Sequence, residues 1–480
     1  MRVLSGLLTA LALAPVAGCV GDIGDGSETT EVAPAPLCDG GLHTGPSPMR
    51  RLTRAEYNAT VRDLFGDTTN PADDFAAEEE ALGFSNNAYA LVVSPTLAEK
   101  YMLAAEGIAA RATEDVLALT SCDPYARSGV RDACVKSAIR KIGRRAFRRP
   151  LTQAEQAEFF AVFLKGTELA KSPRHGPFGM EEADAPPLLA LQTGVAVLTE
   201  AMLQSPEFLY RVELGDPALA AVPGAPGAVR LTSHEMASRL SYYLWGTMPD
   251  EQLFAAADAG GLMTGEEIAA EARRMLSDPK ARDTVENFHR EWLDYDRIGN
   301  VSKDQALFPE YSSAIGALMR EEAAQFIDHV VFDGEGDLAT LLGAPYTIAN
   351  AELAAFYGQS APSEQFTRVE FPAEQRAGLL TMGAMLGYYA HSNQTSPVHR
   401  GKIVREACLC GVIAPPPPDV TFELPMPNPN ASTRERFAEH ASGACATCHK
   451  LMDPIGFGFE NFDGVGRYRT TENGQPLHTS

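Results

Sequence analysis

Positive charge is scarce in this sequence. Its 480 residues include 40 Lys and Arg against 63 Asp and Glu, which gives a formal net charge of −23 at pH 7. Binding to nucleic acid requires clustered positive charge that neutralises phosphate groups, so this balance argues against a nucleic-acid partner. The sequence also lacks a Ser-His-Asp, Walker or dinucleotide-binding fingerprint. It therefore indicates none of these common enzyme chemistries.

Alternating strand patterns are also scarce, and the absence of a fixed repeat period excludes a solenoid. Three segments instead begin with the same helix-start device: LTRAE at Leu52, LTQAE at Leu151 and LTSHE at Leu231. In each, Thr and the Glu three residues later can satisfy free backbone donors reciprocally in a capping box. Apolar spacing indicates further helices at 94–112, 129–148, 187–213, 266–276, 280–297 and 311–332. The sequence therefore predicts a mainly α protein built from several helical modules.

No stretch after the first 19 residues is long and apolar enough to span a bilayer. Within them, Arg2 precedes an apolar stretch too short to cross a membrane, which is typical of an export signal. It ends in VAGC, which resembles a bacterial lipobox; an ordinary secretory signal cleaved nearby is the alternative. We expect residues 1–18 to form a signal peptide, Cys19 to carry lipid, and residues 19–46 to form a flexible tether. Lipid would then anchor the protein to a membrane of the cell envelope, in the periplasm or at the outer-membrane surface.

Export changes how the eight cysteines are interpreted, because disulfides form in oxidising compartments. Cys122 and Cys134 are separated by twelve positions and are the predicted disulfide, worth about 3 kcal/mol on the loop-entropy model. Cys38 can pair with Cys408 or with Cys410, and the sequence leaves that pairing open.

Cys445, Cys448 and His449 form a CxxCH motif close to the end of the chain. This spacing suits thioether bonds from the two cysteines to the vinyl groups of haem, and the following His can ligate the iron. A thioredoxin-type redox pair would expect a βαβ setting, which is absent here, and a structural zinc site would need a further thiolate or His. We therefore predict one haem c, with Cys445 and Cys448 as its attachment points and His449 as the proximal iron ligand.

The second axial ligand must come from elsewhere in the chain. Met452 lies three residues after His449, on the same helical face and the same side of the haem. His391, just after an apolar segment, is the first candidate, and an open sixth position that would permit peroxide or oxygen chemistry is the main alternative. The other upstream candidates are Met382, Met385, His399 and His440.

Several stretches resemble the modular planctomycete-type cytochrome c proteins, a family largely of unknown function. RRLTRAEYNATVRDLFGD and LGFSNNA are similar to its first module, and RRAFRRPLTQAE and SPEFLYRVE to its second. LTSHEMASRLSYYLWGTMPDEQL and FHREWL are similar to the third. RAGLLTMGAMLGYYAHSNQTSPVHRGK, LCGVIAPPPPDV and the CxxCH segment are similar to the haem-bearing module. These stretches cover most of the chain from about residue 47 to 470, in the family's order.

The resemblance implies helical modules at 47–113, 121–213 and 228–358, followed by a c-type haem module at 370–480. Within the last, the run of four prolines at 415–418 predicts an extended polyproline connector before the CxxCH segment. The family usually carries a further small C-terminal domain, which would begin near ENGQPLHTS, and we expect this chain to lack it or to be truncated there.

Taken together, these features predict an exported lipoprotein with one covalently bound haem, acting in electron transfer with a redox partner protein. Two alternatives stay open. One is a haem-dependent peroxidase or oxygenase. The other is a non-catalytic surface protein that binds polysaccharide or a partner. The sequence names no substrate.

Overall fold

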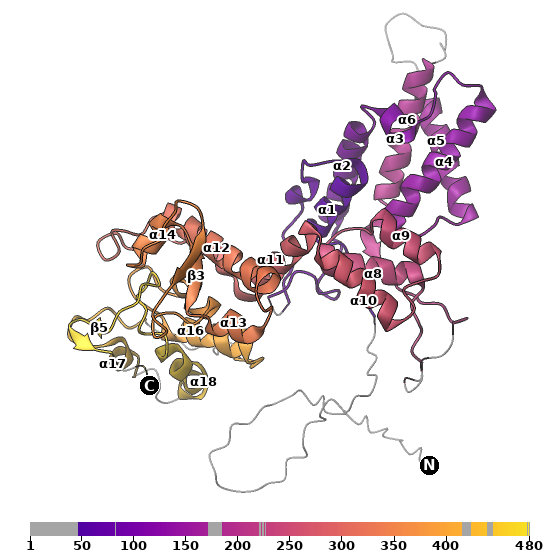
Figure 1. Cartoon of the computed structure of the whole chain (residues 1–480). Helices are drawn as coiled ribbons and strands as arrows, with labels where there is room; N and C mark the ends of the chain where they lie inside the picture. Colours follow the sequence, from indigo (N-terminus) through magenta and orange to yellow (C-terminus); the bar gives the residue numbers. More distant parts are fainter. Residues whose placement is uncertain are drawn as a thin grey trace, which may run out of the picture.

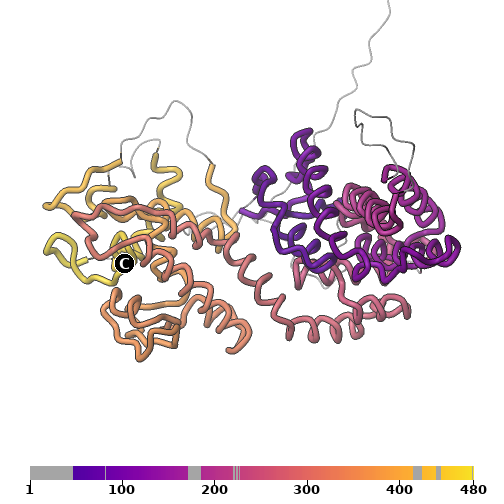
Figure 2. Tube along the Cα trace, turned by 90° about the horizontal axis from the view of Figure 1, so that it is seen from above, coloured from indigo at the N-terminus to yellow at the C-terminus, as the bar shows by residue number. Residues whose placement is uncertain are grey.

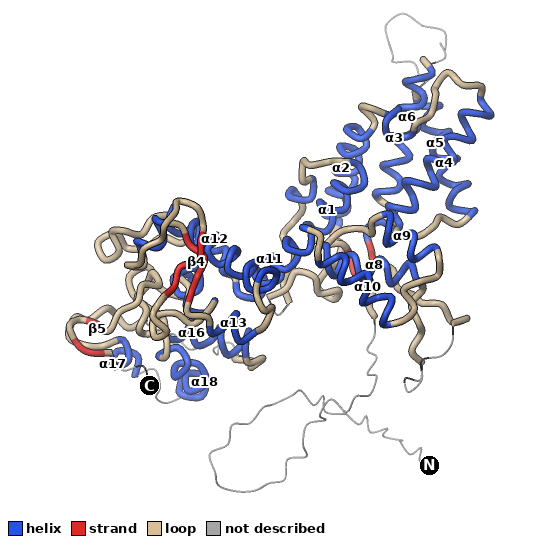
Figure 3. Tube along the Cα trace, in the orientation of Figure 1, coloured by secondary structure: helices blue, strands red, loops and turns tan. Residues whose placement is uncertain are grey.

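The computed structural model describes residues 47–81, 83–170, 185–219, 222, 225, 227–414, 424–438, 445–477 and 479. Figure 3 shows that helices dominate, which confirms the mainly α prediction. The strands among the described residues are short, and each pairs antiparallel with one partner. Some predictions fall outside the described residues: the signal peptide and tether with Cys19 and Cys38, the proline run at 415–418, and His440.

The N-terminal lobe, residues 47–278, is a helical assembly in which a short ribbon joins the segment before α1 (Arg54–Phe65) to the segment after α7 (Pro206–Leu209). β1 (Arg50–Arg51) pairs with β2 (Tyr210–Arg211). The other elements of this lobe are α1 (Arg54–Phe65), η1 (Pro71–Asp74), α2 (Pro95–Ala112), α3 (Val116–Thr120), α4 (Ser128–Phe147), α5 (Gln153–Leu169), α6 (Pro187–Leu203), α7 (Pro206–Leu209), α8 (Ser233–Trp245), α9 (Glu251–Asp258) and α10 (Gly265–Leu276).

The C-terminal lobe, residues 295–479, combines short helices with two small ribbons. β3 (Tyr346–Ala349) pairs with β4 (Thr367–Glu370), and β5 (Thr471–Glu472) with β6 (Gln475–Pro476). Its helices are η2 (Tyr295–Asn300), α12 (Ser313–Asp328), the π-helix η3 (His329–Asp333), α13 (Leu338–Gly343), α14 (Ala351–Phe356), η4 (Leu379–Thr381), α15 (Gly383–Tyr388), α16 (Pro397–Ile403), the π-helix η5 (Val404–Cys408), α17 (Thr433–Phe437) and α18 (Ala446–Phe457).

One helix, α11 (Pro279–Leu293), joins the two lobes. Figures 1 and 2 show it running from the N-terminal helices to the C-terminal elements. Its Ala281 packs into a core with α8, α9 and α10, whereas its Leu293 belongs to the core of the C-terminal lobe. A third core fills the space between the first helices, and Tyr242 of α8 contributes to it. The boundary between lobes therefore runs along a helix inside the third predicted module.

Local signals set most helix starts. The three predicted capping boxes are present at Thr53, Thr152 and Thr232. The helix predicted over 187–213 ends earlier, at Leu203, because Ser205 caps a new short helix whose first residue is Pro206. Cys122 and Cys134 are bonded in a disulfide, which ties the segment after α3 to α4.

Candidate functional site

The CxxCH motif lies in the first turn of α18. Cys445 is the N-cap of this helix, and Cys448 lies one turn further along on the same face. Both thiols are free and partly buried. Two unbonded thiols at this spacing, followed directly by an imidazole, are the donor set that covalent attachment of haem requires. Within the described residues no three His, Cys, Asp or Glu side chains gather as a metal-binding cluster.

His449 is held by a carboxylate on its own helix. Its Nδ1 lies 3.0 Å from Oδ2 and 3.1 Å from Oδ1 of Asp453, one turn later, and the Asp453 side chain is 5% exposed. A carboxylate bonded to Nδ1 fixes the ring orientation and makes Nε2 the nitrogen suited to a metal. The contact between Asp453 and His449 was not predicted from the sequence, although the His-x-x-x-Asp spacing on a helix places the two side chains on one face.

Two glycines allow α18 to pack closely against α16. A Cβ atom on Gly401 would overlap the backbone carbonyl of Met452, and one on Gly456 would overlap the carbonyl of Pro397. Since Pro397 lies opposite Gly456 and Gly401 lies opposite Met452, the two helices run antiparallel. The π-helix η5 continues α16 and also contacts α18, so it extends toward the end of α18 that carries the CxxCH motif.

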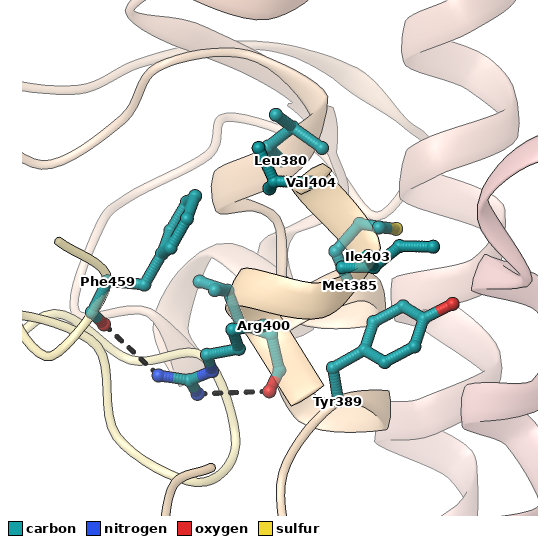
Figure 4. Close-up of a pocket in the computed structure, with 8 residues that line it drawn as sticks. Leu380, Met385, Tyr389, Arg400, Ile403, Val404 and Phe459 are labelled. Atoms are coloured by element: carbon teal, nitrogen blue, oxygen red, sulfur yellow. Dashed lines mark hydrogen bonds between the residues drawn. The ribbon is translucent and has the colours of Figure 1, made fainter. Parts of the chain in front are cut away.

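A buried arginine fixes the turn that follows α18. Arg400 is 2% exposed and donates to the carbonyl groups of Phe459, Phe462 and Asp463 at 3.1, 3.0 and 2.7 Å. It also donates to the carbonyl of Leu386 at 3.0 Å, which ties α15 to the same turn. Burial lowers the pKa of Arg400 to about 10, so the side chain stays charged at neutral pH. Figure 4 shows its guanidinium group and the hydrogen bond to Phe459.

The side chains around Arg400 leave little space. The cavity drawn in Figure 4, which Met385, Tyr389 and Phe459 line with Arg400, has a volume of about 10 Å³. That volume is near the minimum for a single water molecule. Met385 and Met382 are both buried in the core of the C-terminal lobe, so these two candidate ligands serve as core side chains in this structure.

A buried lysine holds the segment that contains His391. Lys303 donates to the carbonyl groups of Gly387, Ala390 and His391 at 2.7, 3.3 and 3.0 Å. The His391 ring lies 5.3 Å from the ring of His399, centroid to centroid. Burial, followed by the nearby His399 and Lys303 charges, lowers the pKa of His391 to about 4, and burial lowers that of His399. With its pKa at about 4, the His391 imidazole is neutral at pH 7, the form that binds metals.

The structure brings His391 together with His399. The segment between them lies beside the residues that follow α18, where Thr395 donates to Glu460 at 2.8 Å. His449 is in the first part of α18, toward the other end of the helix. Among the described contacts none joins His391 to His449, and the pairing of these two residues across a haem stays a prediction.

The sequence motifs and the structure together define a mainly helical protein whose C-terminal lobe carries the CxxCH motif on α18. Comparison with protein families identifies each domain. PSD3, a protein of unknown function (DUF1587), matches residues 50–114, and PSD5, a protein of unknown function (DUF1595), matches 134–213. PSD4, a protein of unknown function (DUF1592), matches 231–359. PSCyt3, a protein of unknown function (DUF1588), matches 376–472.

The chain therefore belongs to the modular planctomycete-type proteins built from these domains, as its motifs indicated. PSCyt3 is the cytochrome-like domain of the set, and it contains the CxxCH motif. Comparison with curated proteins and with solved structures gave no significant match. As for the membrane, no helix in the described part of the chain combines the length and the apolar character needed to cross it.

Proposed function

We propose that this protein is an exported electron carrier that binds one haem c through Cys445 and Cys448, with His449 as the proximal iron ligand. The observation that carries the proposal is the geometry of the first two turns of α18. Both thiols are free there, and the carboxylate of Asp453 lies 3.0 Å from His449 Nδ1. The match to a cytochrome-like domain supports the same assignment.

Each part of the proposed site has a defined task. Haem c bound here would supply the one-electron redox chemistry of its iron. Asp453 orients the His449 ring and increases the basicity of its other nitrogen. The close contact of α16 with α18 and the hydrogen bonds of Arg400 keep the helix in place. A helix held in this way would keep His449 and the two thiols in fixed positions, which suits electron transfer.

The test of attachment is expression in a host with c-type haem maturation, followed by denaturing electrophoresis and haem staining. The wild type should retain its stain, and the double variant Cys445→Ala/Cys448→Ala should lose it because no thioether bond can form. Cys408→Ala, which removes a free thiol outside the motif, is the matched control and should stain like the wild type. Loss of colour from the denatured wild type would reject covalent attachment.

The second axial position distinguishes a carrier from an enzyme. With His391 as distal ligand, the ferric spectrum would be low-spin, and His391→Ala would make it high-spin while haem staining persists. One observation favours a haem-dependent peroxidase or oxygenase: the segment that carries His391 lies beside the residues that follow α18, whereas His449 lies toward the other end of that helix. A high-spin wild type would mean that the sixth position is open, and the proposal would change from carrier to enzyme.

The location of the protein is a separate proposal. We propose that Cys19 is acylated and that the lipid anchors the protein to a cell-envelope membrane, where a redox partner protein exchanges electrons with it. Labelled palmitate should enter the wild type and Cys38→Ser but not Cys19→Ser. Equal labelling of all three, or labelling of none, would reject the anchor.

A further inference from the structure

A large cleft lies in the N-terminal lobe, far along the chain from the CxxCH helix. Its volume is about 1010 Å³, and its walls come from α1, the loop at 84–86, the end of α8 and most of α11. The helices α8 and α11 that form one side pack against each other, and Figure 1 shows both next to α1. Binding pockets for small organic ligands range from about 300 to 1,000 Å³, so this cleft has room for a ligand of several rings.

Aromatic rings stand exposed in this cleft. Tyr243 of α8 is 75% exposed and Phe288 of α11 is 49% exposed. Phe288 stacks on Phe84 at 5.5 Å and on Trp292 at 6.0 Å between ring centroids. The stack fixes Phe288 and Phe84 before any ligand arrives, so little conformational entropy is lost on binding to them. Rigid apolar surface that is open to water in a hollow indicates a binding site.

The charges that line the cleft are balanced, although the whole chain has a net charge of −23. Four of the lining residues are arginines: Arg50, Arg62, Arg211 and Arg239. Four are carboxylates: Glu56, Glu213, Asp283 and Glu291. Arg239 donates to Glu213 through two nitrogens, and Arg211 lies 3.7 Å from Glu56. A polyanion or a polycation would face as many repulsive as attractive charges here, so the lining suits a neutral ligand.

Neutral hydrogen-bonding groups complete the lining. Asn86 offers an amide that both donates and accepts. The hydroxyl groups of Ser85 and Thr284 donate to Glu291 and to the Lys280 carbonyl, and their oxygens can accept further hydrogen bonds. A purely apolar ligand would strip water from these groups without replacing its hydrogen bonds, which is costly. A ligand rich in hydroxyl groups replaces those bonds, and its C–H surfaces can pack on the aromatic rings.

We propose that this cleft binds a neutral oligosaccharide. Sugars combine the properties that the lining requires: no net charge, many hydroxyl groups that donate and accept, and apolar C–H faces suited to Tyr243 and Phe288. The site is in the N-terminal lobe, so the proposal does not depend on haem. It would make the protein a glycan-binding molecule as well as a redox one.

The test uses the full chain and measures binding of β-1,4-linked hexasaccharides of glucose, mannose and N-acetylglucosamine by calorimetry. At least one should bind, and Tyr243→Ala should raise its Kd about tenfold, which corresponds to about 1.4 kcal/mol. The matched control is Tyr89→Ala, since Tyr89 is also 75% exposed but does not line the cleft. Its Kd should equal that of the wild type.

Two further arms make the test decisive. The double variant Cys445→Ala/Cys448→Ala should bind the hexasaccharide as the wild type does, which separates this site from the haem proposal. Oligogalacturonate, which is charged, should bind more weakly than the neutral hexasaccharides. The proposal is overturned if none of the three neutral hexasaccharides binds, if Tyr243→Ala binds as well as Tyr89→Ala, or if oligogalacturonate binds more tightly.

Discussion

At the scale of single residues, polar side chains pair in ways that determine both chemistry and stability. Asp453 contacts His449 within one helix, and Arg149 contacts Glu155 across a helix start. In both pairs a side-chain nitrogen lies within hydrogen-bond distance of a carboxylate oxygen. Each pair therefore leads to a prediction in which the carboxylate is replaced by an amide of almost the same shape.

The first prediction concerns Asp453. If haem binds as proposed, the carboxylate would favour the ferric state, because it would increase electron donation from the His449 ring to the iron. Asp453→Asn should therefore raise the reduction potential, and a tenfold loss of preference for ferric iron would correspond to about 59 mV. Spectroelectrochemical titration measures the change. Glu374→Gln removes an exposed carboxylate of the same lobe and should leave the potential nearly unchanged, and an equal shift in both variants would contradict the assignment.

The second prediction concerns Glu155, which caps α5 and receives two hydrogen bonds from Arg149 at 2.8 and 3.0 Å. The Arg149 guanidinium lowers the pKa of Glu155 from 4.5 to about 2. Because the folded pKa is depressed, the stabilisation is complete above about pH 4.5 and is lost as the pH falls toward 2. Wild type should exceed Glu155→Gln in free energy of unfolding at pH 7 by about 0.2–1 kcal/mol, the range for partly exposed pairs.

Urea unfolding at several pH values measures this difference, and it should shrink toward zero below pH 4. Glutamine preserves the capping box, so the comparison isolates the charge. Glu267→Gln in α10 is the control, because that carboxylate caps Thr264 without an arginine. A pH-independent difference for Glu155→Gln would show that the ion pair contributes nothing.

At the scale of elements, the contact between α16 and α18 determines where the CxxCH motif lies. Glycine at 401 and at 456 lets the two backbones approach more closely than any side chain would permit. Antiparallel packing then brings η5 toward the motif and leaves the segment that carries His391 near the other end of α18. The position of the candidate haem site therefore depends on two residues that have no side chain and no chemistry of their own.

The third prediction tests that contact. Gly401→Ala should lower the free energy of unfolding by about 1–3 kcal/mol, because the added methyl group overlaps the Met452 carbonyl and the helices must separate. Alanine favours helix over glycine, so any loss must come from the contact. Gly343→Ala, in α13 with open space around its Cβ position, is the matched control and should not destabilise. Chemical unfolding of both variants decides, and equal stability would contradict the close packing.

At the scale of the whole molecule, two lobes share one helix, and each has a stabilising feature of its own. The N-terminal lobe contains the Cys122–Cys134 disulfide. The C-terminal lobe contains Glu322, which is fully buried and accepts hydrogen bonds from Thr347 and Tyr357, both at 2.7 Å. Separate cores joined mainly along α11 favour unfolding in two steps rather than one.

The fourth prediction is that scanning calorimetry resolves two transitions. Replacing both Cys122 and Cys134 by Ser should lower only the transition of the N-terminal lobe, by the equivalent of about 3 kcal/mol. Glu322→Ala should lower only the other, by about 3–5 kcal/mol, because Arg376, 3.8 Å away, keeps a buried charge without its partner. A single transition that both variants shift equally would contradict the two-lobe description.

Which parts of this structure could be predicted follows from the range of the interactions involved. Capping boxes such as that at Thr152 lie within four residues, and the sequence predicted them correctly. The buried Arg400 and Lys303 were not predicted, because their partners are backbone carbonyls brought close only by tertiary folding. The same holds for the cleft, whose walls come from residues far apart in the sequence. The CxxCH motif could be recognised from the sequence because its functional residues all lie within five consecutive positions.

The division of α11 between two cores has a consequence for inheritance. The PSD4 match, 231–359, contributes residues to different cores: Tyr242 to the core of the first helices, and Tyr357 to the core of the C-terminal lobe. The Tyr242 hydroxyl of this segment lies 2.9 Å from the Thr60 hydroxyl, and Arg148 lies over the Tyr242 ring. Thr60 belongs to the PSD3 match and Arg148 to the PSD5 match, so residues of all three matches pack together. A recombination event at the start of PSD4 would separate Tyr242 from Thr60 and Arg148. We therefore expect these modules to be passed on together and in this order, as a single heritable block.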